Sequence, residues 1–312
     1  MKLGIGLAAV GRPAYINSGR EADLGAHRGV EDLRARTEAV LDAAYAAGIR
    51  YLDAARSYGR AEEFLAGWLE RHPEIDDVVI GSKWGYRYVG GWRTDAPVHE
   101  VKDHSRDAFA AQVAETEALL GPRLAIYHVH SATLDTGVLD DAALHRDLAA
   151  LRDRGVRVGV STSGPAQADA VRRALDVRVG GEPLFTSVQS TWNLLEPSVG
   201  PALAEAADAG ALVIVKEAVA NGRLTPGAPD APPGAVALAA EVGVPLDQLA
   251  IAAALAQPWA WQVLSGAVDP VQVASNAAAA AVSLDPDAQA RFGALAEDPD
   301  AYWSARSARA WS

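Results

Sequence analysis

Four side chains with acid–base chemistry stand at the ends of three successive apolar runs. Asp53 and Tyr58 lie in GIRYLDAARSYGRAEE, Lys83 follows VVIGS, and His130 ends LAIYHVH. A tyrosine is a poor acid at its unperturbed pKa of ~10, and a nearby ammonium such as Lys83 is expected to lower the pKa of Tyr58. A carboxylate such as Asp53 can hold that ammonium, and a neutral histidine such as His130 can donate a hydrogen bond that orients a substrate oxygen. Each residue alone is as consistent with a surface or core position, but the set predicts a proton-transfer site.

His128 and His130 lie on one face of the same predicted strand, a spacing that can hold a divalent metal. Such a site would indicate a hydrolase, but it needs a third ligand, usually an imidazole from another strand end. The last histidine of the chain, His145, falls inside a predicted helix, so the later strands offer none. We therefore expect no metal site, and a packed core histidine is the alternative role for one of the pair.

The first residues match a dinucleotide-binding fingerprint as a pattern, with Gly4, Gly6 and Ala9 in the G-x-G-x-x-A positions. The structural context fails, because only three residues precede Gly4 and no second strand ending in an acidic residue follows about 20 positions later. Glu21 and Asp23 lie in a polar segment instead. A glycine-rich barrel strand is the better interpretation.

The composition limits the class of protein. The 312 residues are 50% hydrophobic, which is enough for a large core, and a β/α barrel of this length forms one domain. The net charge of −12 argues against nucleic acid and anionic membranes as partners, because phosphate binding needs a basic patch. The chain has no cysteine, which excludes thiolate catalysis and disulfides and suits a reducing cytoplasm, the expected location. No apolar run approaches the ~18 residues of a membrane span, and the apolar stretch 3–10 is too short and glycine-interrupted for a signal peptide.

Short β-branched runs alternate with longer Ala- and Leu-rich segments along the whole chain. The predicted strands are Leu3–Leu7, Arg50–Asp53, Val78–Ser82, Leu124–His130, Val156–Val160, Phe185–Gln189, Leu212–Val215 and Gln262–Leu264. The predicted helices include Glu31–Ala47, Arg106–Leu120, Asp140–Arg154, Gln167–Asp176, Pro201–Ala209 and Leu246–Ala256. Strands that alternate with helices form right-handed βαβ units, and eight such strands predict a single closed (β/α)8 barrel over residues 1–312. The acid–base residues then lie at the carboxyl ends of the second, third and fourth strands, where barrel active sites are built.

Two segments interrupt this alternation. The segment Trp84–Ser105 is predicted to be a long loop whose aromatic side chains, including Trp84, Tyr86 and Trp92, favour an ordered pocket wall. The segment Asn221–Gly234 contains four prolines and three glycines and is predicted to be a loop after the seventh strand.

Around Tyr58 the sequence resembles the aldo-keto reductase family, and the resemblance extends over nearly the whole chain. The family signature Gly-x-Arg-x-x-Asp-x-Ala-x-x-Tyr-Gly-x-x-Glu is matched by Gly48, Arg50, Asp53, Ala55, Tyr58, Gly59 and Glu62. Lys83 matches the family's strand-end lysine, and His130 matches its histidine. The resemblance implies a TIM barrel in which Tyr58 is the general acid/base of a hydride transfer between a nicotinamide cofactor and a carbonyl. It implies that Lys83 and Asp53 tune Tyr58 and that His130 orients the substrate.

The resemblance also implies residues that hold the nicotinamide end of NADP(H) or NAD(H). Ser161 and Thr162 are similar to the family's Ser-Asn pair that holds the carboxamide, and Gln189 is similar to a strand-six glutamine with the same role. The family usually stacks an aromatic side chain from strand seven against the nicotinamide, but this chain has Lys216 there. The stacking face is therefore expected elsewhere, with Trp192 as one option, or the pocket is more polar than usual.

Further matches lie where the family binds the pyrophosphate and the adenosine. They are Asn221, Gly222 and Leu224 in the first segment and Gly266, Gln272 and Asn276 in the second. Members that prefer NADP place Lys or Arg after strand eight for the 2′-phosphate, whereas the stretch 266–272 contains no basic residue. The preference between NADP(H) and NAD(H) is therefore open.

The activity implied is an NAD(P)H-dependent interconversion of an aldehyde or ketone, sugars included, and its alcohol, so the partner is a small carbonyl or alcohol. The substrate pocket is expected to contain Trp84, Tyr86 and Trp92, together with Tyr302 and Trp303 near the C-terminus. The alternative is a non-catalytic auxiliary or redox-sensing subunit that binds the same cofactor. The presence of all four proton-transfer residues argues against that alternative, because a mere binder would be free to lose them.

Overall fold

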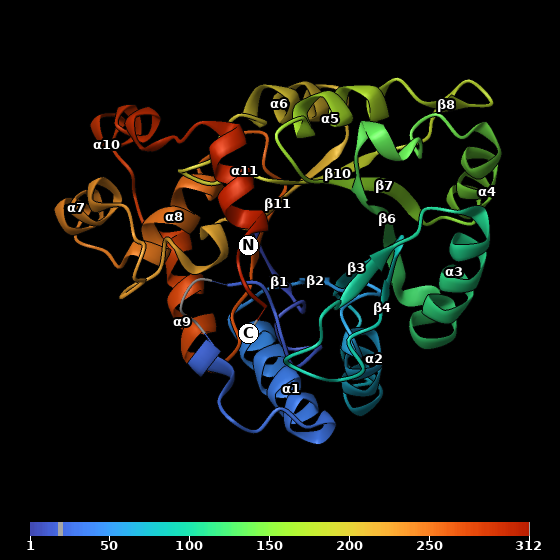
Figure 1. Ribbon diagram of the computed structural model, residues 1–312, viewed down its shortest axis with the longest axis horizontal. Helices are drawn as coiled ribbons and strands as arrows, with labels where there is room; N and C mark the ends of the chain where they lie inside the picture. The colour runs from blue at the N-terminus through green and yellow to red at the C-terminus, as the bar shows by residue number, and fades with distance from the viewer. Residues whose placement is uncertain (18–20, 312) are drawn as a thin grey trace.

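Eight parallel strands close into a barrel in the computed structural model, which describes residues 1–17 and 21–311 (Figure 1). In order around the barrel they are β1 (Leu3–Gly6), β12 (Gln262–Ser265), β11 (Leu212–Lys216), β10 (Ser187–Thr191), β7 (Arg157–Thr162), β6 (Leu124–Ala132), β3 (Val79–Trp84) and β2 (Tyr51–Asp53). Each strand predicted from the sequence is found, with its ends displaced by at most two residues. The predicted (β/α)8 barrel is therefore confirmed.

Helices surround the barrel on its outside (Figure 1). Those between consecutive barrel strands are α1 (Val30–Ala46), α2 (Ala61–Arg71), α3 (Arg106–Leu120), α4 (Ala142–Asp153), α5 (Gln167–Leu175), α6 (Gly200–Asp208), α7 (Pro233–Val242) and α8 (Leu246–Leu255). After β12 follow α9 (Pro270–Ala278), α10 (Pro286–Ala290) and α11 (Pro299–Ser307). Apolar side chains at helical spacing face the barrel, as in α1, where Leu33, Val40 and Leu41 are buried.

Tyr51 fills the barrel interior toward the amino ends of the strands. Its ring meets Trp261 edge-on at 5.3 Å between centroids, and it packs in a buried cluster with Ile126, Ile214 and Leu264. A Cβ at Gly4 would lie 2.8 Å from the Tyr51 ring, and one at Gly81 would lie 2.3 Å from its hydroxyl. Gly4 is therefore required by barrel packing, which agrees with a barrel strand rather than a nucleotide fingerprint.

The two predicted loops contain more regular structure than expected. Trp84 is the last residue of β3, and β4 (Tyr86–Tyr88) pairs antiparallel with β5 (Glu100–Lys102) within the first predicted loop. In the second, a 3-10 turn covers Ala220–Gly222 and α7 begins at Pro233. Proline is tolerated in the first turn of a helix because its missing N–H would have no partner there. A further short hairpin outside the barrel joins β8 (Arg178–Val179) and β9 (Glu182–Pro183).

The C-terminal segment folds back over the carboxyl ends of the strands. Arg306 of α11 donates hydrogen bonds to Glu217, the residue that follows β11. Trp311 forms an isolated β-bridge with Ile16, and its ring stacks on His99 at 4.6 Å between centroids. The segment after β1, the segment before β5 and the C-terminal segment therefore meet at this face of the barrel.

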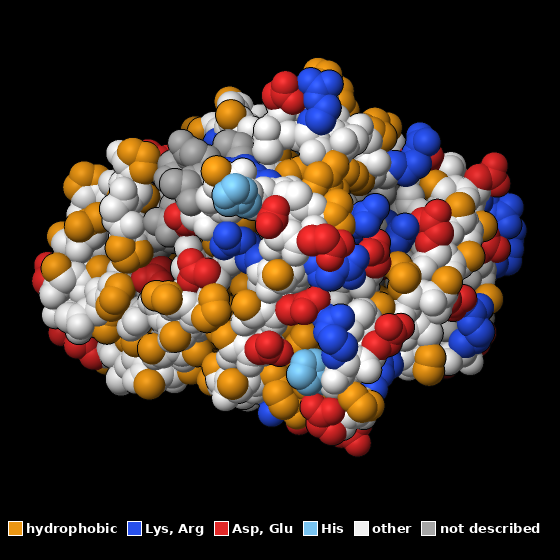
Figure 2. Space-filling view, turned by 90° about the horizontal axis from the view of Figure 1, so that it is seen from below, with side chains coloured by type: hydrophobic (Ala, Val, Ile, Leu, Met, Phe, Trp, Pro, Cys, Tyr) orange, Lys and Arg blue, Asp and Glu red, His pale blue; other side chains and the backbone are white. Residues whose placement is uncertain are grey.

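Charged side chains of both signs cover the face formed by α1 and α2, which is the lower edge of Figure 1 and faces the viewer in Figure 2. Arg34 of α1 pairs with Glu63 of α2 at 2.8 Å, and Arg71 of α2 pairs with Glu38 of α1 at 2.5 Å. Lys and Arg are interspersed with Asp and Glu in this view rather than gathered in one patch. This face therefore offers no field of positive charge to a phosphate backbone.

No single helix in the described ranges is long and apolar enough to cross a membrane. The helices α7 and α8 meet that test of length and composition only together, as a pair bent by 83°.

Candidate active site

The four residues predicted to transfer protons lie together at the carboxyl ends of β2, β3 and β6. Lys83 donates a hydrogen bond of 2.5 Å to Oδ2 of Asp53 and another of 2.9 Å to the carbonyl oxygen of Ala54. The same ammonium lies 4.8 Å from the centroid of the Tyr58 ring. The Tyr58 ring in turn meets the His130 ring edge-on, at 5.6 Å between centroids. The structure therefore brings the predicted set into one cluster.

The surroundings of Tyr58 raise its pKa well above the ordinary 10.0. Burial is the largest cause, the carboxylate of Asp53 acts in the same direction, and the guanidinium of Arg12 opposes both. The expectation that the pKa of Tyr58 is lowered is therefore wrong, because burial and the Asp53 carboxylate raise it, and the Lys83 ammonium is itself paired with Asp53 at 2.5 Å. Tyr58 therefore keeps its proton throughout the neutral pH range.

His130 is a neutral imidazole. Burial, together with the positive charges of Lys83 and Lys216, lowers its pKa well below 6.5. A neutral imidazole has one N–H donor and one acceptor nitrogen. His104 donates a hydrogen bond of 2.8 Å from Nε2 to the backbone carbonyl of His130, which fixes the end of β6. The ring of His130 can therefore donate to a substrate oxygen without bringing a charge.

His128 has a different role from its neighbour two residues on. It is fully buried, its Nε2 lies 3.0 Å from Oγ of Ser187, and burial together with Lys83 lowers its pKa to about 3. Within residues 1–17 and 21–311, no group of three His, Cys, Asp or Glu side chains is arranged to hold a metal ion. His128 thus has the packed role that was the alternative to metal binding.

A cavity of about 700 Å³ opens at the carboxyl face of the barrel. Its catalytic end is lined by Arg12, Asp53, Tyr58, Tyr86, Glu100, His130, Lys216, Glu217 and Arg306. Its distal end, which lies over the amino ends of α8 and α9, is lined by Asp23, Asp247, Gln272 and Asn276. This size is within the range of cavities that hold cofactors and small substrates.

Seven of the ten residues predicted to bind the cofactor line this cavity, namely Gln189, Lys216, Asn221, Gly222, Gly266, Gln272 and Asn276. The other three do not. Oγ of Ser161 accepts a hydrogen bond of 2.8 Å from the backbone of Ser131. The Thr162 hydroxyl lies 2.7 Å from that of Ser190, and Leu224 is fully buried. Ser163, which follows the predicted pair, lines the cavity in their place.

In the side-chain amide of Gln189, the nitrogen is hydrogen-bonded and the oxygen has no hydrogen-bond partner among the described residues. Its Nε2 donates a hydrogen bond of 2.8 Å to Oδ1 of Asp53, while its Oε1 is buried without a partner among the described residues. A buried acceptor without a donor costs about 1–3 kcal/mol. The Oε1 atom is therefore a place where the amide N–H of a ligand would be bound.

Lys216 and Glu217 form an ion cluster with Arg306. Arg306 donates two hydrogen bonds to the Glu217 carboxylate, the one from Nε being 2.9 Å, and Nζ of Lys216 lies 3.7 Å from the same carboxylate. Against the effect of burial, these two cations lower the pKa of Glu217 to about 2. Burial lowers the pKa of Lys216 to about 8, against the attraction of Glu217. The φ angle of Glu217 is 58°, a left-handed conformation of the kind found at functional sites.

Of the five aromatic residues predicted to line the substrate pocket, only Tyr86 does so, with its ring 5.0 Å from that of His130. Trp84 is fully buried against Phe109, because its position at the end of β3 directs it away from the cavity. Trp92 packs against Phe64. Trp192, the proposed stacking face, packs on Trp259. The C-terminal Tyr302 and Trp303 are buried, and the Tyr302 hydroxyl accepts a hydrogen bond of 3.0 Å from Asn193. The expectation that these aromatic residues line the cavity is therefore wrong for five of them, namely Trp84, Trp92, Trp192, Tyr302 and Trp303.

Arg12, Glu100 and Trp311 line the cavity although the sequence did not point to them. Arg12 donates a hydrogen bond of 2.6 Å to Oε1 of Glu100. Its guanidinium carbon lies 5.2 Å from the Tyr58 ring centroid and 4.5 Å from that of Trp311. The residues come from three distant segments, and no spacing or periodicity in the sequence connects them.

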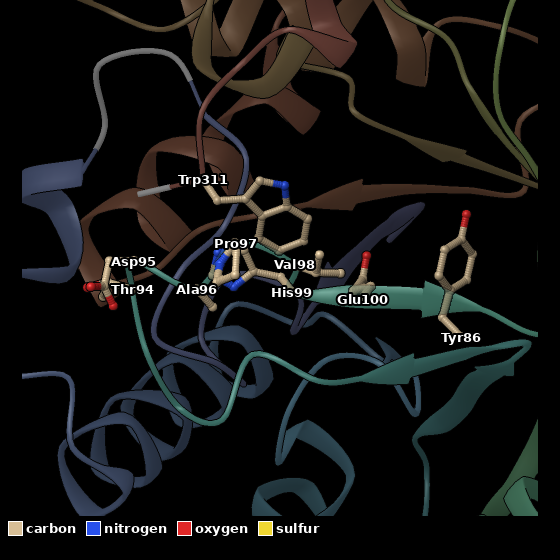
Figure 3. A pocket seen from close by; sticks show the side chains of 9 residues that line it. All are labelled: Tyr86, Thr94, Asp95, Ala96, Pro97, Val98, His99, Glu100 and Trp311. Atoms are coloured by element: carbon tan, nitrogen blue, oxygen red, sulfur yellow. The ribbon is translucent and has the colours of Figure 1, made fainter.

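A second pocket of about 440 Å³ lies beside the cavity and shares Tyr86, Glu100 and Trp311 with it. Figure 3 shows the Trp311 ring over His99, with Glu100 and Tyr86 further along the β4–β5 hairpin. Trp311 therefore lies, with Tyr86 and Glu100, in the wall between the two pockets.

The chain belongs to the aldo/keto reductase family, whose model matches residues 24–297, and this family consists of oxidoreductases. Among curated proteins, an aldo-keto reductase of Strobilurus tenacellus is 44% identical over 46 residues, covering 15% of this chain and 14% of that protein. The D-threo-aldose 1-dehydrogenase of a Pseudomonas species is 30% identical over 202 residues, covering 60% of each protein. The matched stretches thus span 14% and 60% of the length of these two relatives, in both cases less than two thirds.

Solved structures of this family have the same fold. The holo form of an aldo-keto reductase from Bacillus halodurans aligns with a TM-score of 0.69 at 21% identity, over 95% of this chain and 92% of that one. The glycerol dehydrogenase of Gluconobacter oxydans aligns with a TM-score of 0.69 at 20% identity, over 94% and 90%. At this level of identity the likeness establishes the barrel fold.

Proposed function

We propose that the protein is an NAD(P)(H)-dependent oxidoreductase that interconverts a small aldehyde or ketone and its alcohol, with Tyr58 as general acid/base. The observation that carries this proposal is the contact of protonated Tyr58 with neutral His130 at the wall of the cavity. The Lys83–Asp53 ion pair is buried directly behind them. This arrangement supplies one transferable proton and one uncharged hydrogen-bond donor at the same point.

In the direction of reduction, His130 and the Tyr58 hydroxyl donate hydrogen bonds to the carbonyl oxygen and fix the carbon for attack. With the bound cofactor supplying hydride to that carbon, the C=O π pair would move onto oxygen and Tyr58 would transfer its proton to it, so that the oxygen becomes the hydroxyl of the product alcohol. Tyr58 then regains a proton from water. Although the pKa of Tyr58 is raised, an alkoxide is a stronger base than a phenolate, so the transfer is downhill. In the direction of oxidation the same phenol, once ionised, removes the alcohol proton.

The residues at the cavity wall fit a nicotinamide dinucleotide, which when bound supplies or accepts the hydride. Oε1 of Gln189 lacks a donor and would accept one from a carboxamide. The segment after β11 has φ values of 58°, 50° and 54° at Glu217, Ala220 and Asn221, a tight turn beside Gly222 that brings backbone close to the cavity. No atom lies within 4 Å of the place that a Cβ at Gly266 would take, which leaves room for a ligand beside β12.

For the substrate we propose a small hydroxylated carbonyl or its alcohol, aldoses included. Tyr86 and Trp311 offer aromatic faces at the catalytic end, and the Arg12–Glu100 pair offers a donor and an acceptor for neighbouring hydroxyls. The relative named D-threo-aldose 1-dehydrogenase supports the same class.

The test is a panel of aldehydes, ketones and aldoses, assayed with NADH and NADPH and, for the alcohols and aldoses, with the oxidised cofactors. Consumption or formation of reduced nicotinamide that requires the carbonyl or alcohol supports the proposal. A protein that binds a dinucleotide but turns over no member of the panel would instead be an auxiliary or sensing subunit. The variant Tyr58→Phe is the matched control, because it removes one hydroxyl and keeps the ring.

A further inference from the structure

The catalytic end of the cavity has one positive charge more than it has negative charges. The charge of Lys83 is balanced by Asp53, with 2.5 Å between Nζ and Oδ2, and the charge of Arg12 is balanced by Glu100, with 2.6 Å between the guanidinium and Oε1. The remaining charged side chains at this end form the cluster of Lys216, Glu217 and Arg306, in which one carboxylate faces two cations.

Of the two cations in this cluster, Lys216 has the weaker contact with the Glu217 carboxylate. Arg306 takes both oxygens of the Glu217 carboxylate, whereas Nζ of Lys216 stays 3.7 Å from it. The ammonium donates instead to the neutral hydroxyl of Thr191 at 2.7 Å. Lys216 lines the cavity, so its charge is only partly compensated at the wall.

The register of β10 and β11 places this ammonium at the level where a hydride donor has to lie. Lys216 pairs with Thr191, two residues beyond Gln189 on β10. Gln189 is itself hydrogen-bonded to Asp53 in the acid–base cluster. A group that gives hydride to a carbonyl held by Tyr58 must lie within contact distance of that carbonyl, at this same end of the cavity.

We propose that Lys216 makes the site discriminate between the two redox forms of the nicotinamide, with the reduced form bound in preference to the oxidised form. This inference rests on the proposed function. The oxidised ring is a cation and the reduced ring is neutral, so a nearby ammonium repels only the oxidised form. A site that disfavours the oxidised form assists its release after carbonyl reduction and opposes the reverse reaction.

The test is equilibrium binding without substrate, read from the quenching of tryptophan fluorescence. Wild type, Lys216→Met and Lys216→Arg are each titrated with NAD+, NADH and ADP-ribose, which lacks the nicotinamide ring, or with their 2′-phosphorylated counterparts if those bind more tightly. We expect Lys216→Met to bind the oxidised form about tenfold more tightly, equivalent to ~1.4 kcal/mol, with the reduced form and ADP-ribose changed less than about twofold. Lys216→Arg keeps the charge and should keep the wild-type ratio.

Two results would overturn this inference and leave the proposed function standing. One is a ratio of oxidised to reduced affinity that Lys216→Met leaves unchanged. The other is an equal loss of affinity for both forms and for ADP-ribose, which would place the Lys216 charge at the pyrophosphate. A wild-type protein that binds neither redox form of either dinucleotide would overturn the proposed function, and the inference with it. A circular dichroism spectrum that matches wild type shows that a variant is folded, so that a loss of ADP-ribose affinity is not mistaken for misfolding.

Discussion

Gln189 and Asp53 meet across the full width of the barrel. Their strands, β10 and β2, stand four places apart in either direction around the ring, yet Nε2 of Gln189 donates a hydrogen bond of 2.8 Å to Oδ1 of Asp53. The other oxygen of that carboxylate accepts from Lys83. Asp53 therefore connects the acid–base cluster to the residue proposed to bind the carboxamide. A change on either side of this link is expected to affect both proton transfer and cofactor binding.

The substitution Lys83→Met should reduce both stability and turnover. It leaves the Asp53 carboxylate buried beside Tyr58 without its cation, and breaking a buried pair in this way costs about 3–5 kcal/mol. The double variant Lys83→Met/Asp53→Asn removes both charges, so it should recover much of the free energy of unfolding but not the turnover. Urea unfolding and steady-state kinetics on the three proteins measure this. Full turnover in the double variant would exclude the ion pair from the mechanism.

The pH dependence should differ between the two directions of reaction. Because the pKa of Tyr58 is raised above 10.0, the phenol stays protonated at neutral and mildly alkaline pH, so reduction should lose no proton donor there. Oxidation needs the ionised form and should rise about tenfold per pH unit up to that pKa. The lowered pKa of His130 means that reduction shows no inflection near 6.5.

Lys216 also titrates in this range, with a pKa of about 8. The profiles should therefore be measured in parallel on Lys216→Met, which removes that titration and leaves the Tyr58 slope. A plateau in the oxidation rate well below pH 10 in this variant would show that Tyr58 has a lower pKa than its surroundings imply.

The described lining of the distal end of the cavity offers no cation to a 2′-phosphate. The described residues that line this end include no Lys or Arg, but they include two carboxylates, those of Asp23 and Asp247. Asp269 caps α9 by accepting a hydrogen bond from the backbone N–H of Gln272, and the Gln272 side chain donates one of 2.8 Å to Asp23. We expect NAD(H) to be well tolerated, with at best a weak preference for NADP(H). Introducing an arginine by Gln272→Arg should shift the ratio towards NADP(H).

Titration of wild type and Gln272→Arg with both dinucleotides checks this expectation, and Gln272→Met serves as the control for loss of the amide alone. A wild-type preference for NADP(H) above about 100-fold, or ~2.7 kcal/mol, would contradict it. A cation from another part of the chain would then have to reach the phosphate.

The barrel and the acid–base cluster could be predicted from the sequence because both depend on local signals. Each strand is a short apolar run between helical segments, and Asp53, Lys83 and His130 lie at or near the ends of such runs. Parallel strands present their carboxyl ends on one face, so strand-end residues meet whatever the details of packing.

The rest of the site depends on contacts that no local pattern encodes. Arg12 reaches Glu100 across 88 positions, and Trp311 reaches Ile16 from the other end of the chain. The direction of the Trp84 side chain was misjudged because residue 84 was assigned to a loop, whereas it is the last residue of β3. Trp84 is an aromatic beside Lys83, but adjacent residues of a strand face opposite sides, so it packs on α3 rather than in the cavity. The pKa of Tyr58 was misjudged because its burial, the largest cause of the raised pKa, and the carboxylate of Asp53 beside it could not be foreseen from the sequence.

The most direct test of the central claim is the comparison of wild type with Tyr58→Phe in single-turnover reduction, with the dissociation constant of the cofactor measured on the same samples. If Tyr58 donates the proton, the rate of the chemical step falls by ~10²–10⁴-fold, while the dissociation constant stays within about twofold, because the phenyl ring keeps its packing against His130 and Arg12. A single-turnover rate within a few-fold of wild type would show that another group donates the proton and would contradict the account.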